Sequence, residues 1–204
     1  MKKLFISLMV PMLYVSILSA QLRLNVGAGL NLSDLKYNND MVEGNISPAL
    51  NYFVSARPEL GVFEKLSVAV DVQFSRKGYL IDSSTVVTPS AYRIQYLDVL
   101  PQAQYRFINA AAIYTGLGVG FRLSEKAKFN DTWQNTLVKF SNKTDVSYIL
   151  GLRFFPFDKL SAHIQISGML SDFNDIEFTN NFGEMIDVKS KLQNFQLGIA
   201  YQIL

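Results

Sequence analysis

Hydrophobic and polar residues alternate along eight segments of the chain, which is the pattern of β-strands. Between Leu22 and Leu32 every second residue is apolar, and the residues between them are Arg, Asn or Gly. Successive side chains of a strand point to opposite faces, so each segment has one apolar and one polar face. The other seven segments are 50–57, 66–75, 92–107, 113–123, 146–154, 160–167 and 194–203.

The connections between these segments alternate strictly between short and long. The second and third, fourth and fifth, and sixth and seventh segments are joined by short links. The remaining links are long and polar, and they cover Ser33–Ser47, Gly78–Ala91, Ser124–Thr144 and Asp172–Ser190. In an up-and-down sheet, this order places all short turns at one end and all long loops at the other.

These features predict an all-β fold, an eight-stranded antiparallel up-and-down transmembrane β-barrel with short periplasmic turns and long extracellular loops. Outer-membrane barrels have an even number of strands, tight periplasmic turns and longer outward loops. The strand length agrees, since eleven residues tilted by about 40° reach roughly 28 Å and the apolar band is about 25 Å tall.

The glycines indicate which face points into the barrel. All strand glycines except Gly168 lie on the polar face. Eight strands enclose a space that is just wide enough for side chains, so small residues are favoured inside. We therefore expect the polar face to line the lumen and the apolar face to contact lipid.

The aromatic residues are expected to form two belts at the membrane interfaces. The belt near the short turns would contain Tyr105, Phe107, Phe154, Phe155, Phe157 and Tyr201. The belt near the long loops would contain Tyr79, Tyr92, Tyr96, Phe121, Tyr148 and Phe173. Because Ile94 and Tyr96 have the opposite parity to the apolar residues after them, we also expect a bulge near Leu97.

A soluble barrel of the lipocalin type is the alternative fold, with the apolar face around a small ligand. The glycine placement argues against it, as does the absence of cysteine from an exported protein.

The first residues resemble a secretory signal peptide rather than part of the barrel. Lys2 and Lys3 precede an apolar run to Leu18 and the small residues Ser19 and Ala20. We therefore expect residues 1–20 to be removed and residues 21–204 to form the outer-membrane barrel. A membrane anchor is the alternative, but the run is shorter than the roughly 20 residues that a spanning helix needs.

Charge and cysteine content exclude several classes of function. Loss of Lys2 and Lys3 would leave 17 basic residues (19 − 2) against 17 acidic ones, so no basic field for nucleic acid remains. The chain has no cysteine, which excludes disulfides and thiolate metal sites. One histidine and scattered carboxylates give little support to a metal site, and we expect no cofactor.

Charged residues on the inward face are the candidate site. Asp71, Asp98 and Arg122 fall on neighbouring segments at similar heights if the connections are centred. Charges in a narrow lumen must be paired, so we predict a polar network of these three residues that fills the barrel. The network could serve as a gate, but eight strands favour a filled core.

The single histidine, His163, is also expected to face the lumen, beside Ser161, Gln165 and Ser167. Some small outer-membrane barrels modify lipid A with a histidine and a serine, at a site that faces the bilayer. Because His163 and these serines would face inward, we expect a hydrogen-bonded lumen residue and no catalytic role.

Two stretches resemble the PorT-like outer-membrane barrel family that is common in Bacteroidetes. VDVQFSRKGY at 70–79 matches its Tyr-Ser-x-Lys-Gly type run, and YRIQYLDVLPQAQYRF at 92–107 matches its Tyr-Leu-Glu-x-Pro type run, with Asp98 for Glu and one extra residue before Pro101. The closing FQLGIAYQIL resembles the carboxy-terminal signal that the outer-membrane insertion machinery reads. The resemblance implies a small outer-membrane barrel and assigns no activity; some members are linked to secretion or gliding machinery.

The function most consistent with these features is non-enzymatic and resides in the long loops. We expect a binding, assembly or membrane-anchoring role in the cell outer membrane, with lipid, lipopolysaccharide or a protein partner at the loops. The loops could equally be solvated caps. A lipid A-modifying enzyme and a lipocalin-like binder are the alternatives.

Overall fold

The computed structural model describes residues 22–37, 46–82, 89–135, 144–171, 173–179 and 185–204. These residues form ten β-strands in one sheet. The strands are β1 (Leu22–Tyr37), β2 (Ile46–Gly61), β3 (Leu66–Ile81), β4 (Ala91–Ile108), β5 (Ala111–Phe129), β6 (Thr132–Asn135), β7 (Thr144–Phe157), β8 (Leu160–Met169), β9 (Asn174–Thr179) and β10 (Met185–Gln202).

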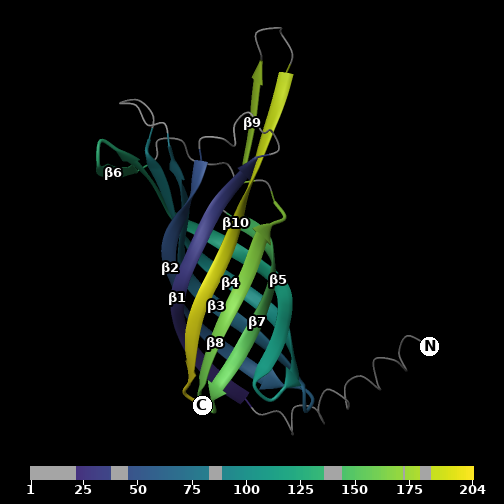
Figure 1. Cartoon of the computed structure of the whole chain (residues 1–204). Coiled ribbons are helices and arrows are strands. Elements are labelled where there is room, and N and C mark those ends of the chain that lie inside the picture. The colour runs from purple at the N-terminus through teal and green to yellow at the C-terminus, as the bar shows by residue number, and fades with distance from the viewer. Residues whose placement is uncertain (1–21, 38–45, 83–88, 136–143, 172, 180–184) are drawn as a thin grey trace, which may run out of the picture.

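Eight of the strands close into an antiparallel barrel (Figure 1). Their order is β1-β2-β3-β4-β5-β7-β8-β10, and β10 pairs back onto β1 from Asn25 opposite Gln202 to Tyr37 opposite Ser190. β6 pairs with β5 and β9 pairs with β10, outside this ring. The predicted eight-stranded up-and-down barrel is confirmed.

The two ends of the barrel differ as predicted. The connections after β2, β4 and β7 are short, and they lie at the end where the C-terminus is found, which we call the turn end (Figure 1). The opposite end, the loop end, carries β6 and the hairpin of β9 with the start of β10, which project beyond the barrel.

The strands extend further into the predicted loops than expected. β1 continues to Tyr37, β5 continues to Phe129 and β10 already begins at Met185. The alternation reverses in these extensions, because inward residues such as Leu35 and Leu192 are apolar and buried while outward residues such as Lys36 and Lys191 are charged and exposed. Backbone pairing continues regardless of side-chain polarity. The remaining parts of the four loops lie outside the described residues.

The apolar face of each strand points outward and the polar face points inward. Leu50 and Ile199 are 68% and 60% exposed on the outer wall, whereas Gln73 and Asn31 are fully buried in the lumen. The inward orientation of the polar face is therefore confirmed, and an apolar ligand cavity of the lipocalin type is not the arrangement found.

Inward glycines leave room for large lumen side chains. A Cβ atom at Gly198 would lie 2.6 Å from both the Phe53 and His163 rings, and one at Gly29 would lie 2.7 Å from Phe53. Gly151 leaves room for Tyr114 in the same way. The outward glycine, Gly168, is covered by the ring of Tyr148 on the neighbouring strand.

The predicted bulge in the fourth segment is wrong. β4 keeps its alternation, because Ile94, Tyr96 and Asp98 are all buried while Leu97 is exposed. The extra residue lies on β5, where Gln95 pairs with Ser124 and Tyr96 with Arg122, so that Leu123 is skipped. The inward residues of β4 change from polar at Asp98 to apolar at Ile94, because the lumen itself is apolar at the height of Ile94.

The predicted aromatic belt at the loop end is wrong for part of its members. Phe121 and Tyr148 are exposed on the outer wall, as expected, but Tyr79, Tyr96 and Phe173 are buried. Tyr92 packs against the same buried cluster. At the turn end, the predicted belt residues Tyr105, Phe107, Phe154, Phe157 and Tyr201 are exposed, as expected.

The predicted signal peptide lies outside the described residues and stays a prediction. Among the residues that the structure describes, no helix has the length and hydropathy that crossing a membrane requires.

Candidate functional site

The lumen side chains form the first candidate site, and the three predicted residues all line it. Asp71 is buried and accepts a hydrogen bond from Gln73 Nε2 at 2.9 Å. Asp98 lies opposite Gln73 on the next strand, one diagonal step from Asp71. Asp98 pairs with Lys77 Nζ at 2.8 Å and accepts a hydrogen bond from Ser75 Oγ at 2.6 Å.

Arg122 forms a bidentate contact with Asp145, a carboxylate that is not part of the predicted network. Its Nε and Nη2 atoms donate to the two oxygens of Asp145 at 2.8 and 2.7 Å. Glu125 lies 3.6 Å away, and the Tyr96 hydroxyl donates to Asp145 at 2.7 Å. Paired, hydrogen-bonded charges of this kind fill a lumen without the cost of an isolated buried ion.

The three predicted residues are therefore neighbours in the sheet, but each is held by a different partner. Lys77 and Asp145 were missed because they lie just beyond the predicted ends of their strands. Both continue the inward parity of those strands, so a longer reading of the alternation would have found them.

Above these ion pairs, at the loop end, the lumen is closed by an apolar cluster. It consists of Leu35, Tyr79, Ile94, Tyr96, Met169, Phe173 and Leu192. The Arg122 guanidinium lies 4.3 Å from the centre of the Phe173 ring, directly beneath this cluster. A lumen that is polar along the whole barrel, as the alternation predicts, does not contain such a cluster, so this part of the expectation is wrong.

His163 is buried in the lumen, as predicted, but its contact is aromatic. Its ring centre lies 5.7 Å from that of Phe53, and its Nδ1 has no hydrogen-bond partner among the described residues. Ser161 Oγ donates to the Ala200 carbonyl at 3.5 Å rather than to the imidazole. The expected hydrogen bond is therefore wrong, and no nucleophile–base contact is formed here.

No metal centre is built by the part of the chain that the structure describes. Within it, no group of three or more His, Cys, Asp or Glu residues could hold a metal ion.

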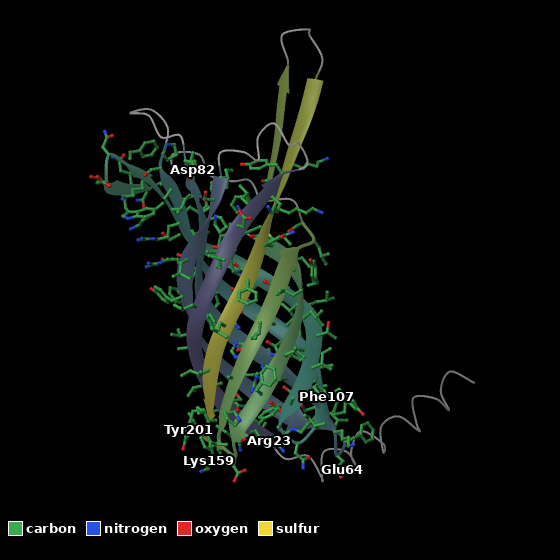
Figure 2. The ribbon with its side chains drawn as sticks, in the orientation of Figure 1. Arg23, Glu64, Asp82, Phe107, Lys159 and Tyr201 are labelled. Atoms are coloured by element: carbon green, nitrogen blue, oxygen red, sulfur yellow. The ribbon has the colours of Figure 1, made fainter. Side chains whose placement is uncertain are left out.

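A second candidate site lies on the outer wall at the loop end. We call it the outer-wall basic patch, and it consists of Arg76 on β3, Arg93 on β4, and Lys126 and Lys128 on β5. Arg93 pairs with Lys126 across the two strands, and Gly78, two residues after Arg76, pairs with Arg93. Figure 2 shows nitrogen-tipped side chains that project from this wall, below β6.

Two aromatic side chains support the patch. The Arg93 guanidinium lies 3.8 Å from the centre of the Trp133 ring. Arg76 lies 4.7 Å from the centre of the Tyr52 ring and donates to its hydroxyl at 3.3 Å. Such cation–π contacts orient a cation without neutralising its charge, so the patch presents a positive surface.

The patch begins where the apolar outer wall ends. Below the patch, the continuous apolar wall reaches Phe74 on β3, Leu97 on β4 and Phe121 with the skipped Leu123 on β5. One further apolar residue, Leu80 on β3, is 41% exposed beyond Arg76. The next outward positions are polar or cationic on all three strands. The continuous apolar wall thus gives way to the patch on all three strands, with Leu80 at the loop-end margin of the patch.

Comparison with known proteins also indicates an outer-membrane β-barrel. A family model described as "outer membrane protein beta-barrel domain" matches residues 5–202. No curated protein matches the chain.

Solved structures share the fold at low sequence identity. Ail of Yersinia pestis, solved with the heparin analogue sucrose octasulfate, is 14% identical, with a TM-score of 0.53 over 90% of this chain and 99% of Ail. OprG of Pseudomonas aeruginosa is 11% identical, with a TM-score of 0.54 over 89% of this chain and 95% of OprG. Neisserial surface protein A is 8% identical, with a TM-score of 0.52 over 87% of this chain and 96% of that protein. A closed barrel with an apolar wall, matched along nearly its whole length by the family model, places the protein in the outer membrane as a member of the outer membrane protein β-barrel domain family.

Proposed function

We propose that this protein is a non-enzymatic, non-conducting outer-membrane barrel that binds lipopolysaccharide at its extracellular end through the outer-wall basic patch. The observation that carries the proposal is the position of Arg76, Arg93 and Lys126 directly above the apolar wall. Lys126 and Lys128 lie in the predicted loop Ser124–Thr144, which agrees with a role of the extracellular end rather than of the lumen.

The height of the patch supports contact with lipid headgroups. Arg93 lies twelve residues beyond Tyr105 along β4 (105 − 93), and Tyr105 is exposed at the turn end. At about 3.3 Å per residue and a tilt of about 40°, this distance is roughly 30 Å, slightly more than the apolar band of about 25 Å. The cations therefore lie at the level of the phosphates of the outer leaflet.

The charge of the patch supports an anionic partner. Within the described residues, the patch has one carboxylate contact, from Asp131 to Lys128 at 2.8 Å, and Asp131 is almost fully exposed. Like charges opposite each other, such as Arg93 and Lys126, destabilise a sheet unless an anion lies between them. The phosphates of lipid A carry this charge at this height, and arginine binds phosphate with two parallel hydrogen bonds.

Lipid binding by paired variants tests the proposal. Purified protein is incubated with lipid A and with dephosphorylated lipid A, and bound lipid is counted by native mass spectrometry. Arg93→Gln with Lys126→Gln is expected to weaken lipid A binding about tenfold, because two charge-assisted contacts are lost. Lys65→Gln with Lys159→Gln, the same loss of charge at exposed turn-end positions, is the matched control.

Two outcomes would contradict lipid A recognition by the patch. One is equal retention of lipid A by the patch variant and the control variant. The other is equal binding of lipid A with and without its phosphates.

A filled lumen supports the non-conducting and non-enzymatic parts of the proposal. The ion pairs of Asp98 and Arg122 lie beneath the apolar cluster, and His163 packs on Phe53. Labelled lipid A should return unchanged from incubation with the protein, and deacylated product would favour the enzyme alternative. Current steps in a planar bilayer would argue against a filled lumen.

Membership in the PorT-like group is a narrower proposal that rests on residues 70–79 and 92–107. Insertion by the outer-membrane assembly machinery rests in the same way on the closing strand, in which Gln196, Gly198, Tyr201 and Ile203 match the expected pattern. A protein partner at the extracellular loops also stays a proposal, and it rests on the projection of the β9–β10 hairpin beyond the barrel.

A further inference from the structure

The turn end of the lumen contains a cavity of about 260 Å³ that is rich in arginine. Arg23 from β1, Arg57 from β2 and Arg106 from β4 converge on it, together with Glu59. Figure 2 shows Arg23 and Lys159 at this end of the barrel. The cavity belongs to neither the outer-wall basic patch nor the ion pairs near the apolar cluster.

Cationic side chains outnumber carboxylates in the lining of this cavity. Glu59 lies 3.7 Å from Arg23 and 3.5 Å from Arg57, distances longer than those of close ion pairs. Arg106 stacks on the Phe155 ring at 4.1 Å, and no carboxylate of the described chain lies within 4 Å of it. With Lys159 and Asp158 included, the lining carries four cations and two carboxylates, a surplus of two positive charges (4 − 2).

One buried cation also has an unused donor. Arg57 is 3% exposed, and its Nε has no hydrogen-bond partner among the described residues. A donor without a hydrogen-bond partner on a buried charge is costly unless water or a bound anion accepts from it. A bound anion would remove both the unpaired donor and the surplus of charge.

The geometry points to a binding site for a small phosphate-type oxyanion that enters from the periplasm. The planar guanidinium groups of Arg57, Arg106 and Arg23 come from three strands and can surround one tetrahedral anion, each with two donors. The volume is slightly below the roughly 300–1,000 Å³ of sites for drug-sized ligands, so the ligand is an inorganic phosphate or a small phosphorylated solute.

The ligand can only enter from the turn end. Deeper in the lumen, Arg153 donates to Gln104 and lies 4.5 Å from the centre of the Tyr114 ring, and all three side chains are buried. Further on, the apolar cluster closes the loop end. The surrounding strands keep water to one side of the site, which strengthens the attraction between the arginines and an anion.

Titration calorimetry with inorganic phosphate tests the site. Refolded full-length protein in a zwitterionic detergent is titrated at constant ionic strength, with acetate and chloride as comparison anions. Arg106→Gln is the first variant, because it removes a cation without leaving Glu59 unpaired. We expect saturable binding of phosphate and about tenfold weaker binding in Arg106→Gln, the effect of one lost charge-assisted contact.

Lys65→Gln, which removes an exposed turn-end cation that does not line the cavity, is the matched control and should bind phosphate as the parent protein does. Heat-dependent gel migration verifies that each variant is folded. If Arg57→Gln also folds, it should lose binding more completely than Arg106→Gln, because its donors are buried.

The same titration separates the sources of the phosphate group. Protein in nanodiscs is titrated with phosphate when the lipid is phosphatidylcholine and when it is phosphatidylglycerol. Equal affinity in both supports a soluble ligand, and loss of affinity only in phosphatidylglycerol identifies a lipid headgroup as the occupant and overturns entry from the periplasm. No saturable heat with phosphate, equal affinity in Arg106→Gln, or preference for acetate would overturn the phosphate site. Failure of lipid A binding by the outer-wall basic patch would leave this result unaffected.

Discussion

The two ends of the lumen have opposite chemistry, although the same strands build both. At the loop end, Asp98 and Arg122 have close partners and lie beneath apolar side chains. At the turn end, Arg23 and Arg57 share one carboxylate at longer distances around an open cavity. The barrel is thus sealed toward the outside and open toward the periplasm.

This difference teaches that a lumen of eight strands is not uniform. Strand alternation determines which residues point inward, but it does not determine whether the inward residues meet each other or water. Close ion pairs and apolar packing require exclusion of water, whereas a surplus of cations is tolerated where water or a solute anion can reach them.

The largest expected effect is at the sealed end. Asp145→Ala removes the carboxylate that holds Arg122 and leaves a buried cation without its main partner. We expect the free energy of unfolding to fall by about 3–5 kcal/mol, measured by urea unfolding in lipid vesicles. Glu59→Ala at the turn end is the matched change, and its loss should be much smaller, because Glu59 lies 3.7 and 3.5 Å from Arg23 and Arg57 and the adjoining cavity has room for water. Equal losses at both ends would contradict the comparison.

A smaller effect is expected from the apolar cluster. Leu35→Ala creates a cavity among fully buried side chains and should lower the free energy of unfolding by about 2–4 kcal/mol. Phe63→Ala, at an exposed turn-end position, should leave stability nearly unchanged. If Leu35→Ala were neutral, the loop end would not be packed as a core.

Gly198, which lies between the two ends of the lumen, tests how tightly the middle of the lumen is packed. Gly198→Val places a side chain against Phe53 and His163 and should cost about 1–3 kcal/mol of stability through overpacking. Gly61→Val is the control, because no atom lies within 4 Å of a Cβ there. The pair of unfolding curves should differ in midpoint and not in slope.

The smallest expected effect concerns salt. Screening of the surplus cations at the turn end should stabilise the parent protein by less than about 1 kcal/mol between low and moderate ionic strength. Arg106→Gln should show a weaker response, and Lys77→Gln should show no such reduction, since Lys77 is already paired with Asp98. A stronger salt response in Arg106→Gln would argue against a surplus of positive charge.

The sequence was sufficient to predict the barrel, its strand order, its two kinds of ends and the inward face. These features follow from alternation and link length, which are local properties of the chain. The inward glycines were also interpretable, because only a crowded lumen needs small residues at those positions, and Gly198 shows the reason with Phe53 and His163.

The candidate site was less predictable, since it depends on partners from distant strands. Asp98 and Arg122 were recognised as lumen charges, but Lys77 and Asp145 became visible only when the strands proved longer than the alternation suggested. Ile94 was interpreted as a phase shift because an apolar inward residue has the same local pattern as a bulge. Whether Ile94 faces the lumen can be decided only from the apolar residues of other strands that pack against it.

Closure between β1 and β10 joins nearly the first and nearly the last described residues, with Asn25 opposite Gln202. Pairing of β1 with β10 should therefore be the slowest step of folding, because it closes a loop that spans almost the whole chain. The contacts between the two strands form only when both are already in place. Loss of the last strand would leave two unpaired backbone edges in hydrocarbon, where each unsatisfied amide costs several kcal/mol. A shortened chain should thus fail to insert at all, and no stable seven-stranded intermediate should accumulate in the bilayer.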